Sequence, residues 1–288
     1  MQPSVRKLTS IRARALERDE KGEQSARMNE SNRLSSHGTS RSPAHEVLFF
    51  DDPGMLTRGV FQYLREGLEA GEPAVVIATE DHCRAFVSEL ERDGILPRHS
   101  GLLTCLDAEE TLTRFMATGR PDPKRFQNSV GRLIEDLSPG RSGGRLRAYG
   151  EMVNLLWASG HSGAAAELEH LWNRLLGAHG FRLLCAYAID VFSREFQPAV
   201  VDDVLRSHTH ILAGARETRL CDALNRASEE VLGHRPGDPR SAAGLRPSWA
   251  AMSEAHARIL CLRSNLRERS EEVLSRARQY FLASEARV

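Results

Sequence analysis

The amino-acid sequence predicts an α/β protein in which a parallel sheet is covered by helices. From residue 45 onward, short apolar runs alternate with longer segments of helical period, which is typical of strands joined by crossover helices. The run 181–189 is apolar on both faces apart from Arg182, as expected for a central strand with helices on each side. The five predicted strands are 47–50, 74–78, 102–106, 146–149 and 181–189.

Helical periodicity fills the segments between these runs and continues after the last one. Several of the predicted helices stop at a glycine, which is a common helix end. Inside the sheet region they cover 55–70, 81–93, 108–117, 123–137 and 164–179, and after it 198–212 and 219–232.

The C-terminal segment has the pattern of one amphipathic helix. From residue 252, apolar side chains recur every seventh position, at Met252, Ile259, Leu266, Val273 and Tyr280. The second core position of a coiled coil is polar, because it is filled by His256, Arg263 and Ser270. Docking of this helix on its own domain, or on a partner, is therefore favoured over a long coiled coil.

The pattern divides the chain into five segments. Residues 1–44 form a polar arm with too few large apolar side chains to build a core, and we expect it to be disordered. The α/β domain covers 45–212, a helical extension covers 213–233, a linker rich in proline and glycine covers 234–248, and the C-terminal helix covers 249–288.

Whole-chain composition excludes several classes of protein. The 39 basic residues balance the 39 acidic ones, and the basic excess of the N-terminal arm is modest, so nucleic-acid binding is disfavoured. No apolar run approaches the roughly 18 to 20 residues of a membrane span, so no membrane association is expected. The five cysteines contain no CxxC pair, which favours reduced thiols in a cytoplasmic protein.

A ligand of an open parallel sheet belongs at the carboxyl ends of the strands. The first strand is followed by DDPGMLT, which begins with Asp51 and Asp52. A phosphate-binding loop needs several glycines, a lysine for the phosphates and a hydroxyl for magnesium. This segment has one glycine, no lysine and two carboxylates that repel a triphosphate, so an intact phosphate-binding loop is not expected.

Other polar residues at strand ends are candidates for ligand contacts. Acidic residues at such junctions commonly cap the next helix, but Glu151 follows a strand that also carries Arg147 and Tyr149. A carboxylate beside a guanidinium can read a ligand, and an ordinary salt bridge is an equally good explanation. The complete set of candidate ligand contacts is Asp51, Asp52, Thr79, His82, Arg147, Tyr149, Glu151, Trp157 and Tyr187.

Trp157 and Tyr187 from that set, together with Trp172 and Phe181, are compatible with an aromatic pocket, although core packing is the commoner role for such residues. His208 and His210, placed on a helix, would point about 200° apart and could not easily share a metal. No Cys/His spacing typical of zinc and no nucleophile–histidine motif is visible. The sequence therefore predicts no catalytic residue, no metal and no cofactor.

Several short motifs together resemble a known family, the MEDS sensory domain of methanogen, methylotroph and dichloromethane-responsive regulator proteins. In chain order they are HEVLFF from residue 45, GLEAGE from 67, ATEDH from 78, LDAEETL from 106, RAYGEM from 147, LLW from 155, LEHLWN from 168, LCAY from 184 and HTHIL from 208. The resemblance covers residues 45–212 and implies a three-layer fold similar to RecA/KaiC-type ATPases without their phosphate-binding loop.

The resemblance implies a bacterial or archaeal signalling module that senses a small ligand, with hydrocarbon-like compounds as the proposed class. The leading hypothesis is a regulatory protein that binds a small molecule or partner without catalysis, and whose segment 249–288 contacts a protein partner or a second copy. One alternative is a weak ATPase or phosphotransferase that uses Asp51, Asp52 or Glu151 around magnesium. Another is an interaction adaptor that acts only through the C-terminal helix.

Overall fold

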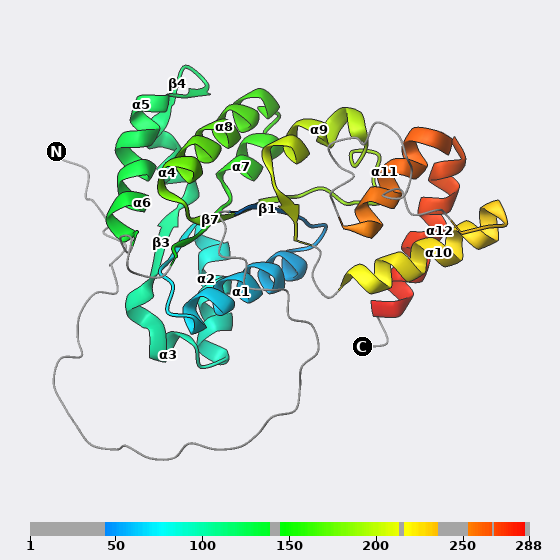
Figure 1. The fold of residues 1–288 in the computed structure, drawn as a ribbon, viewed down its shortest axis with the longest axis horizontal. Helices are drawn as coiled ribbons and strands as arrows, with labels where there is room; N and C mark the ends of the chain where they lie inside the picture. Colours follow the sequence, from blue (N-terminus) through cyan, green and yellow to red (C-terminus); the bar gives the residue numbers. More distant parts are fainter. Residues whose placement is uncertain (1–43, 139–144, 213–215, 236–252, 267, 286–288) are drawn as a thin grey trace, which may run out of the picture. The chain divides into compact units, whose positions relative to one another are not determined.

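The fold is built on a parallel sheet with helices on both faces, as the sequence predicts, but the sheet has six strands where the sequence predicts five (Figure 1). The computed structural model describes residues 44–138, 145–212, 216–235, 253–266 and 268–285. Within them the strand order is β3-β2-β6-β7-β1-β8, so β7 lies centrally, as expected from its apolar sequence. The strands are β1 (Ala44–Phe49), β2 (Ala74–Ala78), β3 (Leu103–Asp107), β6 (Arg147–Gly150), β7 (Arg182–Tyr187) and β8 (His210–Ile211).

One face of the sheet is covered by α1 (Pro53–Glu69) and α2 (Glu80–Arg92). The alternating side chains of β1 show how this layer forms, since Leu48 packs towards α1 whereas Val47 and Phe49 enter the core on the other side. Asp52 begins α1 by accepting a hydrogen bond from the Met55 amide through its side chain, at 2.8 Å.

The opposite face carries the larger core, centred on Trp172. Trp172 is fully buried and packs edge to face against Phe126, with ring centroids 5.4 Å apart. The helices of the sheet region that follow α2 are α3 (Leu96–His99), α4 (Ala108–Phe115), α5 (Pro123–Phe126), α6 (Arg132–Leu137), α7 (Met152–Ala158), α8 (Ser162–His179) and α9 (Pro198–Ser207).

Two predicted helices are shorter than the periodicity suggested. The helix predicted over 108–117 ends at Phe115, and a hairpin of β4 (Met116–Ala117) and β5 (Arg120–Pro121) follows it, with Gly119 at φ 80° in its turn. The helix predicted over 198–212 ends at Ser207. The chain then extends along the open edge of β1, whose His45 carbonyl accepts a hydrogen bond from the Thr209 amide at 2.7 Å. Pairing of this strand edge outweighs the local helical pattern.

The C-terminal segment forms two helices where the sequence predicts one. They are α11 (Glu254–Leu266) and α12 (Glu268–Glu285), and both pack with α10 (Glu217–Leu232). In α11 the consecutive residues 255–260 are all buried, so this part of the helix is covered on every side. In α12 only a single stripe, which includes Val273 and Ala277, is buried. The two halves therefore pack in different environments. The predicted arm 1–44, apart from its last residue, and the predicted linker 234–248, apart from its first two, lie outside the described residues.

These helices join the core of the α/β domain, so of the two alternatives left open by the sequence, the described residues show contacts with the segment's own domain. His256 of α11 lies among aromatic side chains of the domain, with its ring centroid 5.7 Å from that of Phe196. Arg263 donates hydrogen bonds to the carbonyls of Phe192 and Ser193, at 3.0 and 2.8 Å. Within the described residues, no helix is long and apolar enough to cross a membrane.

The close contact between α1 and β6 can be tested by substitution of Gly67. A Cβ atom added at Gly67 would lie 2.5 Å from Cδ of Arg147, which is buried beneath the helix. We predict that Gly67→Ala lowers the free energy of unfolding by about 1–3 kcal/mol, because overpacking displaces Arg147. Urea denaturation followed by circular dichroism measures the change.

Gly177→Ala is the matched control, because Gly177 lies in α8 with open space around its Cα. Alanine there should stabilise the protein by about 0.5–1 kcal/mol through helix propensity. A Gly67→Ala variant stabilised to the same extent would show that α1 does not approach the sheet as closely as described.

Candidate functional site

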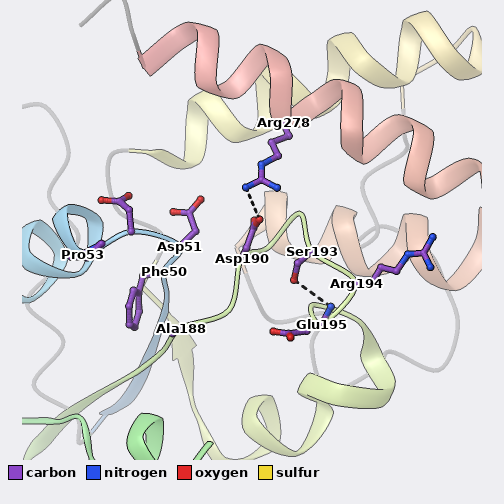
Figure 2. A pocket seen from close by; sticks show the side chains of 10 residues that line it. Phe50, Asp51, Pro53, Ala188, Asp190, Ser193, Arg194, Glu195 and Arg278 are labelled. Carbon is purple, nitrogen blue, oxygen red and sulfur yellow. Dashed lines mark hydrogen bonds and ion pairs between the residues drawn. The ribbon is translucent and has the colours of Figure 1, made fainter. Parts of the chain in front are cut away.

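An open crevice lies at the carboxyl ends of β1 and β7, where the fold class predicts a ligand (Figure 2). Its volume is about 510 Å³, which is in the range of small-molecule sites. Asp51 and Asp52 contribute from the end of β1, and Asp190 contributes from the segment after β7. The complete lining is Phe50, Asp51, Asp52, Pro53, Ala188, Asp190, Ser193, Arg194, Glu195 and Arg278.

The negative charge of the crevice is offset by two arginines that come from the helical part of the chain beyond the sheet. Arg278 of α12 reaches Asp190, with Nη2 3.0 Å from Oδ2 (Figure 2). Arg216, immediately before α10, lies 3.6 Å from an Asp51 oxygen and 3.8 Å from an Asp52 oxygen. The helices beyond the sheet therefore complete the crevice electrostatically.

The ionisation of Asp51, one of the crevice carboxylates, is affected by its surroundings. Burial raises its pKa above the ordinary value, and the nearby Arg216 acts in the opposite direction. Asp52 has a structural role as the cap of α1 and remains about half exposed, with 48 % of its side chain accessible. Of the two residues that follow β1, Asp51 is the better placed to respond to a bound ligand.

Three of the predicted site residues meet at the carboxyl ends of β2 and β6. Glu151 is buried, and its carboxylate accepts a hydrogen bond from the Thr79 amide at 3.1 Å. Its other oxygen lies 2.7 Å from Nδ1 of His82, and this hydrogen bond raises the pKa of the imidazole. These residues fix the junction between β2 and α2, and they are not part of the crevice lining.

The predicted pairing of Arg147 with Glu151 does not occur. Arg147 is the first residue of β6 and Glu151 follows the last, so the two side chains belong to opposite ends of the strand. The guanidinium of Arg147 donates to Glu72 at 2.6 Å and to the Tyr63 carbonyl at 2.8 Å. Arg147 and Glu151 are only four positions apart in the sequence, but in an extended strand this spacing places them at opposite ends.

The predicted aromatic residues are part of the core. Tyr149 is fully buried beneath α2 and packs edge to face on Phe86, with centroids 5.4 Å apart. Trp157 and Tyr187 contact each other, with centroids 5.5 Å apart; Tyr187 belongs to the larger core, and the partly buried Trp157 packs against it. Core packing, the commoner explanation, accounts for all three rings.

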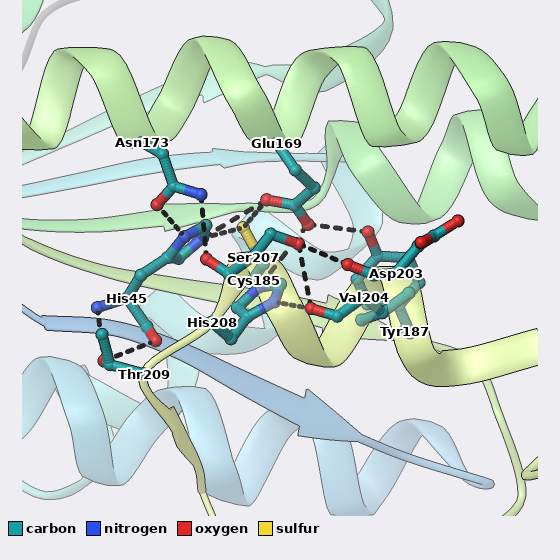
Figure 3. A network of polar contacts seen from close by, with 10 residues as sticks. All are labelled: His45, Glu169, Asn173, Cys185, Tyr187, Asp203, Val204, Ser207, His208 and Thr209. Atoms are coloured by element: carbon teal, nitrogen blue, oxygen red, sulfur yellow. Dashed lines mark hydrogen bonds and ion pairs between the residues drawn. The ribbon is translucent and has the colours of Figure 1, made fainter. Parts of the chain in front are cut away.

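A second polar cluster lies within the larger core, between the sheet and α8 (Figure 3). His45 comes from β1, Glu169 from α8, Cys185 from β7 and His208 from the segment after α9. One nitrogen, oxygen or sulfur atom from each of these four side chains lies within 4.8 Å of the others. Tyr187 borders the cluster and donates a hydrogen bond from its hydroxyl to Glu169 at 2.6 Å.

Burial holds this cluster close to electrical neutrality. It lowers the pKa of His45 to about 4 and raises the pKa of Glu169 to about 7, because the charged forms lose their hydration. The same desolvation lowers the pKa of His208 and raises that of the Cys185 thiol. The buried thiol is therefore poorly suited to nucleophilic catalysis.

Sequence spacing did not show this cluster, because consecutive members are separated by 124, 16 and 23 residues. The interpretation of the His208–His210 pair was also wrong in its premise, because neither residue lies on a helix. The useful signal lay in the motifs themselves, since HEVLFF, LEHLWN, LCAY and HTHIL each contribute one residue. Parallel pairing of β1 with β7 and β8 brings three of these motifs together.

The fold and the crevice define an α/β domain whose acidic carboxyl edge is completed by C-terminal helices. The family model of the MEDS domain, the methanogen/methylotroph, DcmR sensory domain, matches residues 44–209, which is more than half of the chain. The protein belongs to this family, and the resemblance drawn from its motifs is confirmed. Neither a search of curated proteins nor a search of solved structures finds a match.

The hydrogen bond between His82 and Glu151 predicts a pH-dependent stability. The pKa of His82 is raised in the folded protein, so its contribution is fully present below the unfolded value near 6.5 and is lost as pH rises through the folded pKa. We predict that His82→Ala costs about 1 kcal/mol near pH 6 and less near pH 8. Urea denaturation of both proteins at the two pH values measures this difference.

His170→Ala provides the control, because His170 lies on the exposed side of α8. Its effect should be small at both pH values. An equal cost of His82→Ala at the two pH values would contradict a charged hydrogen bond between His82 and Glu151.

Proposed function

We propose that this protein is a cytoplasmic regulatory protein that binds a small molecule in the crevice between β1 and β7 and does not catalyse a reaction. The observation that carries the proposal is the shared construction of the crevice, because the ends of β1 and β7 supply Asp51 and Asp190, which pair with Arg216 before α10 and with Arg278 of α12. Membership of a sensory-domain family supports the same role. The five cysteines are all free thiols, which fits a reducing compartment.

The ion pairs give the crevice a means of acting on the C-terminal helices. A ligand that contacts Asp190 or Asp51 competes with the arginine that the carboxylate now holds. Such a ligand shifts the position of α12 or α10 only if it binds one arrangement of these helices more tightly than the other. Binding in the crevice would thereby be transmitted to the surface of the C-terminal helices.

The chemistry of the lining favours binding over catalysis. The crevice residues include no lysine, histidine or cysteine within the described part of the chain. The ATPase alternative places magnesium on Asp51, Asp52 or Glu151, and of these Glu151 is held by Thr79 and His82 outside the lining, which leaves Asp51 and Asp52. Calorimetric titration with Mg-ATP tests this alternative, and saturable, magnesium-dependent binding would support it.

A protein partner or a second copy of the chain remains the proposed receiver of the signal at segment 249–288. The apolar stripe of α12 is occupied by α10, and Leu282 is the large apolar side chain that stays exposed among the described residues. A receiver would therefore contact mainly the charged side of α12. An adaptor acting only through this segment is disfavoured, because α11 is packed into the core of the domain.

Native mass spectrometry of the full chain tests for a small-molecule ligand. We predict that the protein carries a non-covalently bound small molecule, either as purified or after incubation with an extract of small metabolites. Asp190→Asn should lower the fraction of protein that carries this molecule at least tenfold. The reason is that this substitution removes the carboxylate charge that faces the crevice. Asp93→Asn, just after α2 and outside the lining, is the control. Equal retention in both variants would place the ligand elsewhere.

The contact between Arg278 and Asp190 predicts local coupling without a large effect on global stability. Arg278→Ala should lower the free energy of unfolding by less than about 1 kcal/mol, because the pair is partly exposed. Amide hydrogen exchange in α12 should nevertheless become measurably faster.

Arg114→Ala, which breaks an exposed pair with Glu110 on α4, should leave α12 unchanged. Unaltered exchange of α12 in Arg278→Ala would show that the ion pair does not hold the helix against the crevice.

A further inference from the structure

Three ligand atoms of the buried cluster have the mutual spacing of a tetrahedral metal site, and the fourth, from His208, completes a set that lies within 4.8 Å. His45 Nε2 lies 3.3 Å from Cys185 Sγ and 3.3 Å from a Glu169 oxygen. The same Glu169 oxygen lies 3.7 Å from Cys185 Sγ, and the second oxygen lies 3.5 Å from His208 Nε2. A tetrahedron with zinc bonds of about 2.0–2.3 Å has edges of roughly 3.3–3.7 Å.

Hydrogen bonds on the far side of each imidazole determine which nitrogen faces the centre of the cluster. Asn173 donates its side-chain amide to the Ser207 carbonyl at 2.9 Å, so its oxygen is turned towards His45 Nδ1, 2.9 Å away (Figure 3). Nδ1 of His45 must therefore carry the proton, and Nε2 presents a lone pair. This arrangement matches the outer hydrogen bonds that orient metal-binding histidines.

His208 is oriented in the same way. Its Nδ1 lies 2.5 Å from the Val204 carbonyl oxygen, which can only accept, so Nδ1 donates and Nε2 again presents a lone pair. The side chain is 1 % exposed, and Nε2 has no hydrogen-bond partner. A buried acceptor left without a donor is costly, and a cation at the centre of the cluster would satisfy it.

Charge and ligand type both suit a divalent ion of intermediate softness. A thiolate from Cys185 and a carboxylate from Glu169 together cancel the two positive charges of such an ion, so the buried site would be neutral. Two imidazoles, one thiolate and one carboxylate are ligands that zinc accepts in four-coordinate sites.

We propose that His45, Glu169, Cys185 and His208 bind one zinc ion. Binding replaces the water ligands of the ion and releases to solvent the thiol proton of Cys185 and, where Glu169 is protonated, its proton as well. The ion would tie together β1, β7, α8 and the segment that follows α9. This site is separate from the crevice, since none of its ligands lines it.

Metal analysis and cobalt substitution of the full-length protein test the proposal. Zinc added to chelator-treated protein should bind at about one equivalent per chain. Cobalt in its place should give the intense visible absorption of a tetrahedral ion and a near-ultraviolet thiolate-to-cobalt band. The wild-type spectrum reports the ligand set even if a ligand variant fails to fold.

The variants assign the ligands. Cys185→Ser should abolish the thiolate band, and Asn173→Ala, which removes the partner of His45, should weaken zinc affinity by about 10–100-fold. Cys261→Ser and His210→Ala, which change a cysteine and a histidine outside the cluster, should leave both readouts unchanged. Less than about a tenth of an equivalent of zinc after reconstitution, or a thiolate band that persists in Cys185→Ser, would overturn the proposal.

Discussion

The pairing of β1 with β7 is the interaction on which the rest of the structure depends. The two strands are in parallel register over six residue pairs, from Ala44 with Arg182 to Phe49 with Tyr187. This register places His45 near Cys185 within the core and brings Asp51 and Asp190 together at the carboxyl edge. A shift of the register by one residue would turn the buried side chains of β1 to the opposite face. It would separate the residues of the buried His45 cluster and those of the crevice.

The larger core extends from the sheet to the C-terminal helices without interruption. It contains Phe49 of β1, Trp172 of α8, Ile259 of α11 and Val273 of α12. Packed interiors transmit displacements because they contain few voids that could absorb them. The ion pairs of Arg216 and Arg278 therefore join elements that also share this core. The shared core supports the proposal that ligand binding in the crevice displaces the C-terminal helices.

Sequence reasoning predicted the layered sheet and the central position of β7, because apolar periodicity reports burial directly, and it left the C-terminal segment open between docking on its own domain and on a partner. It also placed Asp51 and Asp52 at the crevice, since strand ends follow from strand assignment. It could not foresee the division of the last helix, because no glycine or proline marks the break between α11 and α12 and the two differ only in what they pack against. The sequence did not predict the His45 cluster either, because its members are distant in the sequence and are brought together by the register of the strands.

Amide hydrogen exchange of the full-length chain, with and without a small molecule that native mass spectrometry shows to bind, tests the central claim most directly. The account predicts that binding changes exchange around residues 50–53 and 188–195, which form the crevice, and also in α12 and the first turn of α10. A change confined to the crevice, with α10, α11 and α12 unaltered, would contradict coupling between ligand and helices.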